Sequence, residues 1–252
     1  MFGATMEILK KKILKAEAGL IPINWIRKEN NSWLAREFPQ KRILPEKTAY
    51  SEKIEGLASE TNAAGPQPLW EGYGDNDAFG QTRIPNSVRT TAAMGNLYSL
   101  LVERKKPDIV VEFGTAFGVS GMYFLAGINN NDKGQLLTFE PNEVWAKMAR
   151  YNLSQISHRF TLTVGTFEDN IKTALQEECC IGMAFIDAIH TKEFVIPQLD
   201  IVVANCCSKA IILLDDINFS ESMRECWREV AVDERFASVA TFGDRVGVLE
   251  LQ

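Results

Sequence analysis

The chain has 252 residues, 46% of them apolar and 24% charged, which is enough length and hydrophobic content to bury a large core. Its net charge of -6 and isoelectric point near 5.2 argue against nucleic acid or an anionic membrane surface as the main partner. No apolar run reaches the length needed to span a bilayer, so we expect a cytoplasmic protein with no membrane partner.

Residues 1–86 are predicted to form an N-terminal helical extension. Helical spacing indicates helices at 4–18, 22–37 and about 46–60, and the lysines among the apolar residues of the first favour an amphipathic helix over a signal peptide. These helices could pair in a homodimer. Residues 64–86 contain four glycines and three prolines around three aromatic residues, so they predict either a lid over an active site or a packed connector.

Residues 87–252 predict one doubly wound α/β domain. A helix at 87–104 leads into short, continuously apolar runs that alternate with helical patterns, as expected for parallel strands covered on both faces. The turn Gly243-Asp244-Arg245 is short enough for a hairpin, so the last strand of the seven-stranded sheet should be antiparallel. The seven expected strands are 108–113, 135–139, 161–164, 182–186, 210–214, 237–242 and 246–251.

Five cysteines include the adjacent pairs Cys179-Cys180 and Cys206-Cys207, with Cys226 alone. None has the spacing of a zinc ribbon or of a C-x-x-C redox centre. Each lies in or beside a segment with a core pattern, so we expect free, buried cysteines with a structural role.

A glycine turn follows the first strand and opens a helix. It reads Glu112-Phe113-Gly114-Thr115-Ala116-Phe117-Gly118, and its glycines let the backbone approach a ligand at a helix N-terminus. Ala116 stands where the dinucleotide fingerprint needs its second glycine, which argues against a dehydrogenase. The order acid-x-Gly-x-x-x-Gly instead resembles class I S-adenosylmethionine-dependent methyltransferases, and the resemblance covers about residues 87–252.

That resemblance implies S-adenosylmethionine as the cofactor and a Rossmann-like fold. Glu140 ends the next strand, in phase to accept hydrogen bonds from both ribose hydroxyls. Phe167 and Glu168 map to the adenine contact, although Glu168 could also belong to a solvated first helical turn. Val88 to Thr90 map less distinctly, near the methionine moiety. The cofactor-binding residues implied are Glu112, Gly114, Thr115, Gly118, Ser120, Glu140, Phe167, Glu168 and Asp187.

Three aspartates end two neighbouring strands. Asp187 ends the fourth predicted strand, and Asp215 ends the fifth with Asp216 directly after it. All three should lie at the carboxyl edge of the sheet, where ligands bind in such folds. Gathered carboxylates repel one another, so a proton or a hard divalent cation must compensate, and oxygen ligands favour Mg²⁺ or Mn²⁺. The alternative is that Asp187 caps a helix and Asp215 contacts the cofactor.

The spacing of these aspartates resembles that of metal-dependent O-methyltransferases. Asp215 and Asp216 follow Asp187 by 28 and 29 residues, as the metal ligands do in catechol O-methyltransferase, and macrocin-type sugar O-methyltransferases are similar, with Asp-Asp at the second site. The resemblance implies Asp187, Asp215 and Asp216 as metal ligands. It also implies transfer of a methyl group to a hydroxyl of a small molecule, whether a natural product, a sugar or a phenol.

His190 is the candidate catalytic base, beside Asp187. It stands three positions after Asp187, where catechol-type enzymes carry a lysine, and histidine can take a proton near neutral pH. A supporting or structural role for His190 is equally open.

Two alternatives to a metal-dependent O-methyltransferase remain. The first is a metal-independent N- or C-methyltransferase whose aspartates bind an amine. The second is a non-catalytic cofactor-binding protein, against which the carboxylates and His190 count. Trp70 and Tyr73 are candidates to close over the acceptor.

Overall fold

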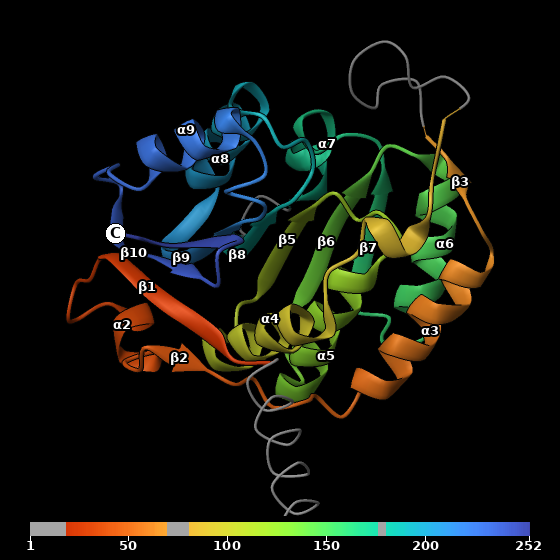
Figure 1. The fold of residues 1–252 in the computed structure, drawn as a ribbon, viewed down its shortest axis with the longest axis horizontal. Helices are drawn as coiled ribbons and strands as arrows, with labels where there is room; N and C mark the ends of the chain where they lie inside the picture. The colour runs from red at the N-terminus through yellow and green to blue at the C-terminus, as the bar shows by residue number, and fades with distance from the viewer. Residues whose placement is uncertain (1–18, 70–80, 176–179) are drawn as a thin grey trace, which may run out of the picture.

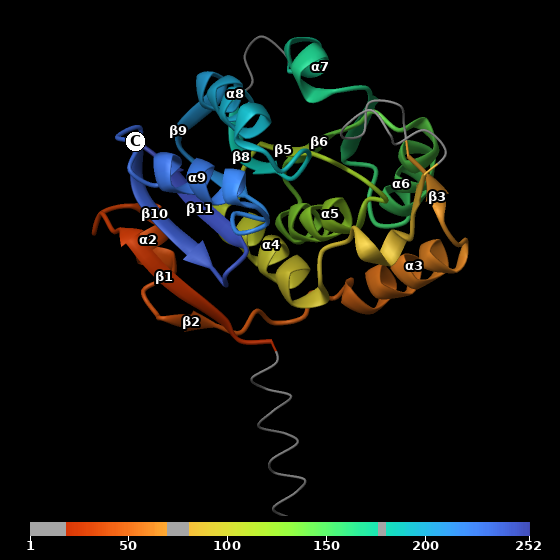
Figure 2. The same ribbon diagram turned by 45° about the horizontal axis from the view of Figure 1, so that its top comes forward.

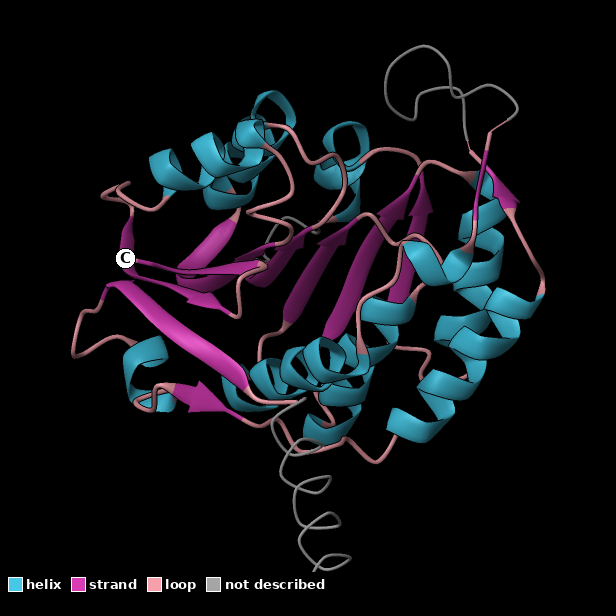
Figure 3. Cartoon of the chain, in the orientation of Figure 1, coloured by secondary structure: helices cyan, strands magenta, loops and turns pink. Residues whose placement is uncertain are grey.

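A mixed sheet crosses the computed structural model, which describes residues 19–69, 81–175 and 180–252 (Figures 1 and 3). Within these residues the sheet has nine strands in the order β2-β1-β10-β11-β9-β8-β5-β6-β7. Strands β9, β8, β5, β6 and β7 are parallel, and β11, β10, β1 and β2 each pair antiparallel with their neighbours. The strands are β1 (Ile21–Arg27), β2 (Arg42–Ile43), β5 (Ile109–Phe113), β6 (Gln135–Glu140), β7 (Phe160–Val164), β8 (Ile181–Ile186), β9 (Cys206–Leu214), β10 (Phe236–Phe242) and β11 (Val246–Leu251).

Helices cover both faces of this sheet (Figures 1 and 2). Alternate residues of the same strand point to opposite layers: Val110 packs with one helix layer and Val111 with the other. Both are fully buried, which is why the central strands read as continuous apolar runs. The first layer contains α3 (Ser51–Ala63), α4 (Ala92–Lys105), α5 (Val119–Asn131) and α6 (Glu143–Ser154); the second contains α7 (Phe167–Ala174), α8 (Lys192–Ala204) and α9 (Glu221–Val230).

The seven strands expected from the sequence are all present, and the last is antiparallel as predicted. The helical patterns expected to alternate with these strands are also present as helices, and the Ser220 side chain caps α9 by accepting a hydrogen bond from the Met223 amide. The helix expected at 87–104 is α4, which begins at Ala92. A short 3-10 helix at Pro85–Ser87 precedes it. The expected helix near 46–60 corresponds to α3.

The helix predicted at 22–37 is wrong. Residues 21–27 form strand β1, which pairs with β10 and extends the sheet, and only Trp33–Glu37 is helical, as α2. Ile21 and Ile23 are buried while Pro22 and Asn24 are exposed, which is the period-2 pattern of a strand. The predicted helix at 4–18 and the aromatic residues Trp70, Tyr73 and Phe79 lie outside the described residues.

The N-terminal segment is bound firmly to the sheet. Both carboxylate oxygens of the buried Glu250 in β11 accept backbone N–H bonds from the start of α2, at 2.8 and 2.7 Å. The Arg27 guanidinium donates to the carbonyls of Val232, Asp233 and Phe236. A carboxylate at a helix N-terminus also meets the positive end of the helix dipole. These contacts make residues 21–37 part of the same folded unit as the last two strands.

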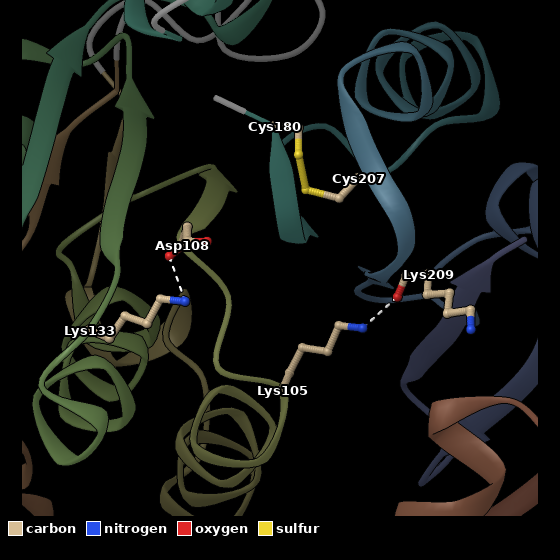
Figure 4. The surroundings of a disulfide bond; sticks show 6 residues. All are labelled: Lys105, Asp108, Lys133, Cys180, Cys207 and Lys209. Atoms are coloured by element: carbon tan, nitrogen blue, oxygen red, sulfur yellow. Dashed lines mark hydrogen bonds and ion pairs between the residues drawn. A yellow bond between two sulfur atoms is a disulfide. The ribbon is translucent and has the colours of Figure 1, made fainter. Parts of the chain in front are cut away.

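A disulfide joins the starts of two central strands. Cys180, just before β8, is bonded to Cys207 at the start of β9, so the expectation that these cysteines are free is wrong (Figure 4). The periodicity places both in core segments but does not reveal a pairing across 27 residues. Cys206 and Cys226 are free. Asp108 pairs with Lys133 at the same end of the sheet. Among the described helices, none is both long and apolar enough to cross a membrane.

Candidate functional site

The glycine turn leaves β5 and enters α5 with an unusual backbone. Gly114, Ala116 and Gly118 all have positive φ, and Gly118 precedes the first residue of α5. A Cβ at Gly114 would lie 2.0 Å from the carbonyl oxygen of Asp187, so no larger residue fits between the ends of β5 and β8. The turn therefore brings the helix N-terminus and Asp187 to one edge of the sheet.

Glu140 is connected directly to this turn. Its Oε2 accepts the Ala116 amide at 2.7 Å and its Oε1 accepts the Asn142 amide at 2.9 Å. Burial raises the pKa of Glu140 to about 7, against the effect of these two bonds. Each carboxylate oxygen keeps a further acceptor site, which suits the hydroxyl pair of a ribose.

Glu112 and Ser120 bond to each other. The Ser120 hydroxyl donates to Glu112 at 2.5 Å, and the Thr138 hydroxyl donates to the other carboxylate oxygen at 2.7 Å. Glu112 is fully buried, and burial raises its pKa to about 7. Ser120 lines a small cavity with Gly114, Thr115 and Asp187. Glu112 is not among the described residues that line this cavity or the larger cleft beside it.

The predicted adenine segment lies at the start of α7. Thr166 caps this helix, and Phe167 is buried with its ring stacked on Phe113, 3.6 Å between centroids. Glu168 accepts a hydrogen bond of 2.6 Å from Gln198 of α8. Thr166, Phe167 and Glu168 line a cleft that Gly114 and Ala116 of the glycine turn also line.

A cleft of about 790 Å³ runs along the carboxyl edge of the parallel strands, within the range of small-molecule sites. It is lined by most of the residues predicted from the sequence, which come both from the cofactor group and from the aspartates. The cleft is also lined by Arg83, Val88 and Arg89. Arg83 belongs to the 64–86 segment, and Val88 and Arg89 belong to the stretch at 88–90 that the resemblance places near the methionine moiety. The predicted site residues that line it are Gly114, Glu140, Phe167, Glu168, Asp187, His190 and Asp216.

Asp187, His190 and Asp216 form the chemical centre of the cleft. One ligand-type atom from each lies within 4.8 Å of the others. His190 Nε2 is 3.6 Å from Asp187 Oδ1 and 3.5 Å from Asp216 Oδ2. Burial raises the pKa of both carboxyls, with a further rise from neighbouring acids, and burial lowers the pKa of His190. The donor set of two carboxylates and one imidazole fits a divalent cation such as Mn²⁺ or Mg²⁺.

Asp215 is not part of this group. Its carboxylate is 1% exposed and accepts two hydrogen bonds from Arg245, at 2.7 Å from Nε and 2.6 Å from Nη2. Arg245 Nε also lies 3.1 Å from Asp216 Oδ1. The sequence reasoning missed Arg245, although a signal existed: β11 pairs antiparallel with β9, so the turn before β11 must lie at the edge where β9 ends.

Two exposed aromatic residues flank His190 at the cleft. Phe219 is 69% exposed, and its ring centroid lies 5.3 Å from that of His190. Phe194, near the start of α8, is 47% exposed and lines the same cleft. Neither residue was singled out from the sequence, because each stands in a segment without a distinctive motif.

Comparison with known proteins gives one family match and one curated relative. Residues 111–217 match a family described as methyltransferase domain. A Mycobacterium avium protein described as an O-methyltransferase is 31% identical over 100 residues, which are 39% of this chain and 44% of that protein. The chain thus spans less than half the length of this relative.

Solved structures share the fold over most of the chain. The O-methyltransferase TomG from Streptomyces achromogenes, in complex with SAM, has a TM-score of 0.60 at 16% identity and covers 83% of this chain and 92% of its own. An O-methyltransferase from Bacillus cereus, in complex with SAH, has a TM-score of 0.61 at 16% identity and covers 87% and 96%. The matched segment includes the glycine turn and the three aspartates, so residues 111–217 are similar to a methyltransferase domain, and the chain shares its fold with the two solved O-methyltransferases.

Proposed function

We propose that this protein transfers the methyl group of S-adenosylmethionine to a hydroxyl of a small molecule, assisted by a divalent cation. The observation that carries the proposal is the cleft itself, which joins Glu140 and the glycine turn to the Asp187, His190 and Asp216 group. A cofactor held by Glu140 and the glycine turn would share this cleft with the Asp187, His190 and Asp216 group. The curated relative and the similar structures named above are O-methyltransferases, which supports the choice of oxygen.

In this proposal some residues of the cleft bind the cofactor and the cation, and His190 takes part in proton transfer. Glu140 would hold the ribose, and Asp187 and Asp216 would hold the cation. The cation would supply Lewis acidity, lowering the pKa of the acceptor hydroxyl. Burial lowers the pKa of His190, which favours the neutral imidazole, and a neutral His190 would accept the hydroxyl proton at Nε2. S-adenosylmethionine would supply an activated methyl group, with its sulfur as the leaving group that takes the electron pair of the broken bond. Alignment of these atoms in the cleft provides much of the acceleration.

A second role for His190 is favoured by its geometry. Nε2 lies almost equally far from Asp187 and Asp216, so it could complete the cation's ligand set. The two roles differ in what His190→Gln changes. Loss of a base lowers the transfer rate and leaves cation affinity intact, whereas loss of a ligand weakens cation binding as well.

The experiment is transfer of an isotopically labelled methyl group to a panel of phenols, vicinal diols and sugars. Wild-type protein should label at least one hydroxyl compound, and Asp187→Asn should label none above background. Labelling of amines alone would replace the proposal with an N-methyltransferase. S-adenosylhomocysteine binding without labelling of any acceptor would favour a binding protein.

A further inference from the structure

Arg245 joins the two adjacent aspartates that end β9. It donates two hydrogen bonds to the Asp215 carboxylate, one from Nε and one from Nη2, and its Nε also forms an ion pair of 3.1 Å with Asp216 Oδ1. A fork of this kind is the geometry in which a guanidinium recognises a carboxylate most specifically, and lysine cannot reproduce it. Because Asp215 is buried, its charge requires such a partner.

The turn that contains Arg245 is hydrogen-bonded to the loop that follows Asp216. The Ile217 amide donates to the Arg245 carbonyl at 3.0 Å, and the Asn218 side chain donates to the Asp244 carbonyl at 2.5 Å. Asp216, directly before these two residues, has a positive φ of 52°, a conformation that is uncommon for a residue other than glycine. The terminal hairpin thus fixes the backbone and the carboxylate of Asp216 together.

We propose that Arg245 is the resident counter-ion and a positioning residue of this site: it keeps Asp215 out of the cation's ligand set and holds Asp216 beside Asp187 and His190. This inference rests on the cation of the proposed function. Of the three carboxylates, one is neutralised inside the protein and two face the cleft. The sequence spacing alone would make all three aspartates equivalent as cation ligands. The two hydrogen bonds from Arg245 to Asp215 distinguish that aspartate from the other two.

Mn²⁺ binding to the protein without cofactor or acceptor, measured by electron paramagnetic resonance, tests the proposal. Three carboxylates and one guanidinium leave two negative charges in wild type, three in Arg245→Met and one in Asp215→Asn. The double variant Asp215→Asn/Arg245→Met again leaves two. If charge alone decides, Arg245→Met binds Mn²⁺ about tenfold more tightly than wild type and Asp215→Asn about tenfold more weakly.

The double variant is decisive and contains no unpaired buried charge, so it can be assayed even if Arg245→Met does not fold. Affinity within about threefold of wild type supports the proposal, since charge is restored while Asp215 is gone. A loss as large as that of Asp215→Asn alone would show that Asp215 is a ligand and overturn it. Arg235→Met is the matched control: Arg235 is 40% exposed against 41% for Arg245, pairs with Asp233 and Asp200, and does not line the cleft. Its Mn²⁺ affinity should equal that of wild type.

Arg245→Lys tests the positioning role. It keeps the charge and loses the fork, so displacement of Asp216 should lower kcat about tenfold with cofactor KM unchanged. An unchanged kcat would contradict positioning.

Failure of the proposed function can be distinguished from failure of this inference. If wild type binds no Mn²⁺ but Arg245→Met does, the Arg245 guanidinium occupies the cation site. The proposed cation requirement is then wrong, while the role of Arg245 as counter-ion to the aspartates is supported. If neither binds Mn²⁺, the inference falls.

Discussion

The backbone amide of Ala116 donates a 2.7 Å hydrogen bond to Glu140, and this bond links the glycine turn to the end of β6. Ala116 has a positive φ of 46°, so the turn presents its amide in a conformation that Glu140 helps to hold. The acid that would bind the ribose therefore also shapes the loop beside it.

Glu140→Gln should weaken S-adenosylhomocysteine binding about 10- to 100-fold, because it removes a charged acceptor of hydrogen bonds from the ligand and from Ala116. Isothermal titration calorimetry measures the change. Glu143→Gln, at an exposed position in the first turn of α6, should bind like wild type. Equal affinities for the two variants would remove Glu140 from the cofactor site.

His190→Gln should lower the methyl-transfer rate by about 10² to 10⁴, the usual contribution of a positioned base. The rate should also lose its dependence on the His190 titration. Mn²⁺ affinity, measured separately, should be unchanged. A parallel loss of Mn²⁺ binding would instead assign His190 to the ligand set. His158→Gln, at an exposed position outside the cleft, serves as the control.

Phe219→Ala should raise the acceptor KM about fivefold, since the exposed ring beside His190 provides a stacking surface for an acceptor. Cofactor affinity should not change. Tyr151→Ala removes an aromatic ring that is 58% exposed on α6, away from the cleft, and should leave the acceptor KM unaltered. An acceptor KM that is insensitive to Phe219→Ala would place the acceptor elsewhere.

Glu112 should make the protein less stable as the pH rises from 5 to 8. Its pKa of about 7 in the folded protein exceeds the ordinary 4.5, so the folded state retains the proton longer than the unfolded chain. The resulting stabilisation is complete below the unfolded pKa and is lost as the pH rises through 7. It amounts to about 3 kcal/mol. Urea unfolding of Glu112→Gln should show a correspondingly smaller pH dependence, and an identical pH dependence in both proteins would contradict the assignment.

The parallel half of the fold was predictable because its signals are local. Continuous apolar runs, the glycine turn at Gly114 and the acid at Glu140 each occupy a few consecutive residues. Strand β1 was missed because its partner β10 lies more than 200 residues away in the sequence, and because seven residues are too few to separate a strand period from a helical one.

Within the site, strand ends were placed correctly but side-chain partners were not. Asp187 and Asp216 meet at the cleft, as the parallel register requires. Asp215 was expected beside them, yet its carboxylate turns inward to Arg245, whereas Asp216, whose backbone has a positive φ, lines the cleft. The Cys180–Cys207 bond is a second case in which pairing depends on three-dimensional proximity alone.

The most direct measurement is methyl transfer by wild-type protein to its best hydroxyl acceptor after exhaustive chelation, followed by addition of Mg²⁺ or Mn²⁺. We predict loss of nearly all activity on chelation, its recovery with either ion, and no recovery in Asp216→Asn. Full activity in the chelated protein would contradict cation-assisted transfer.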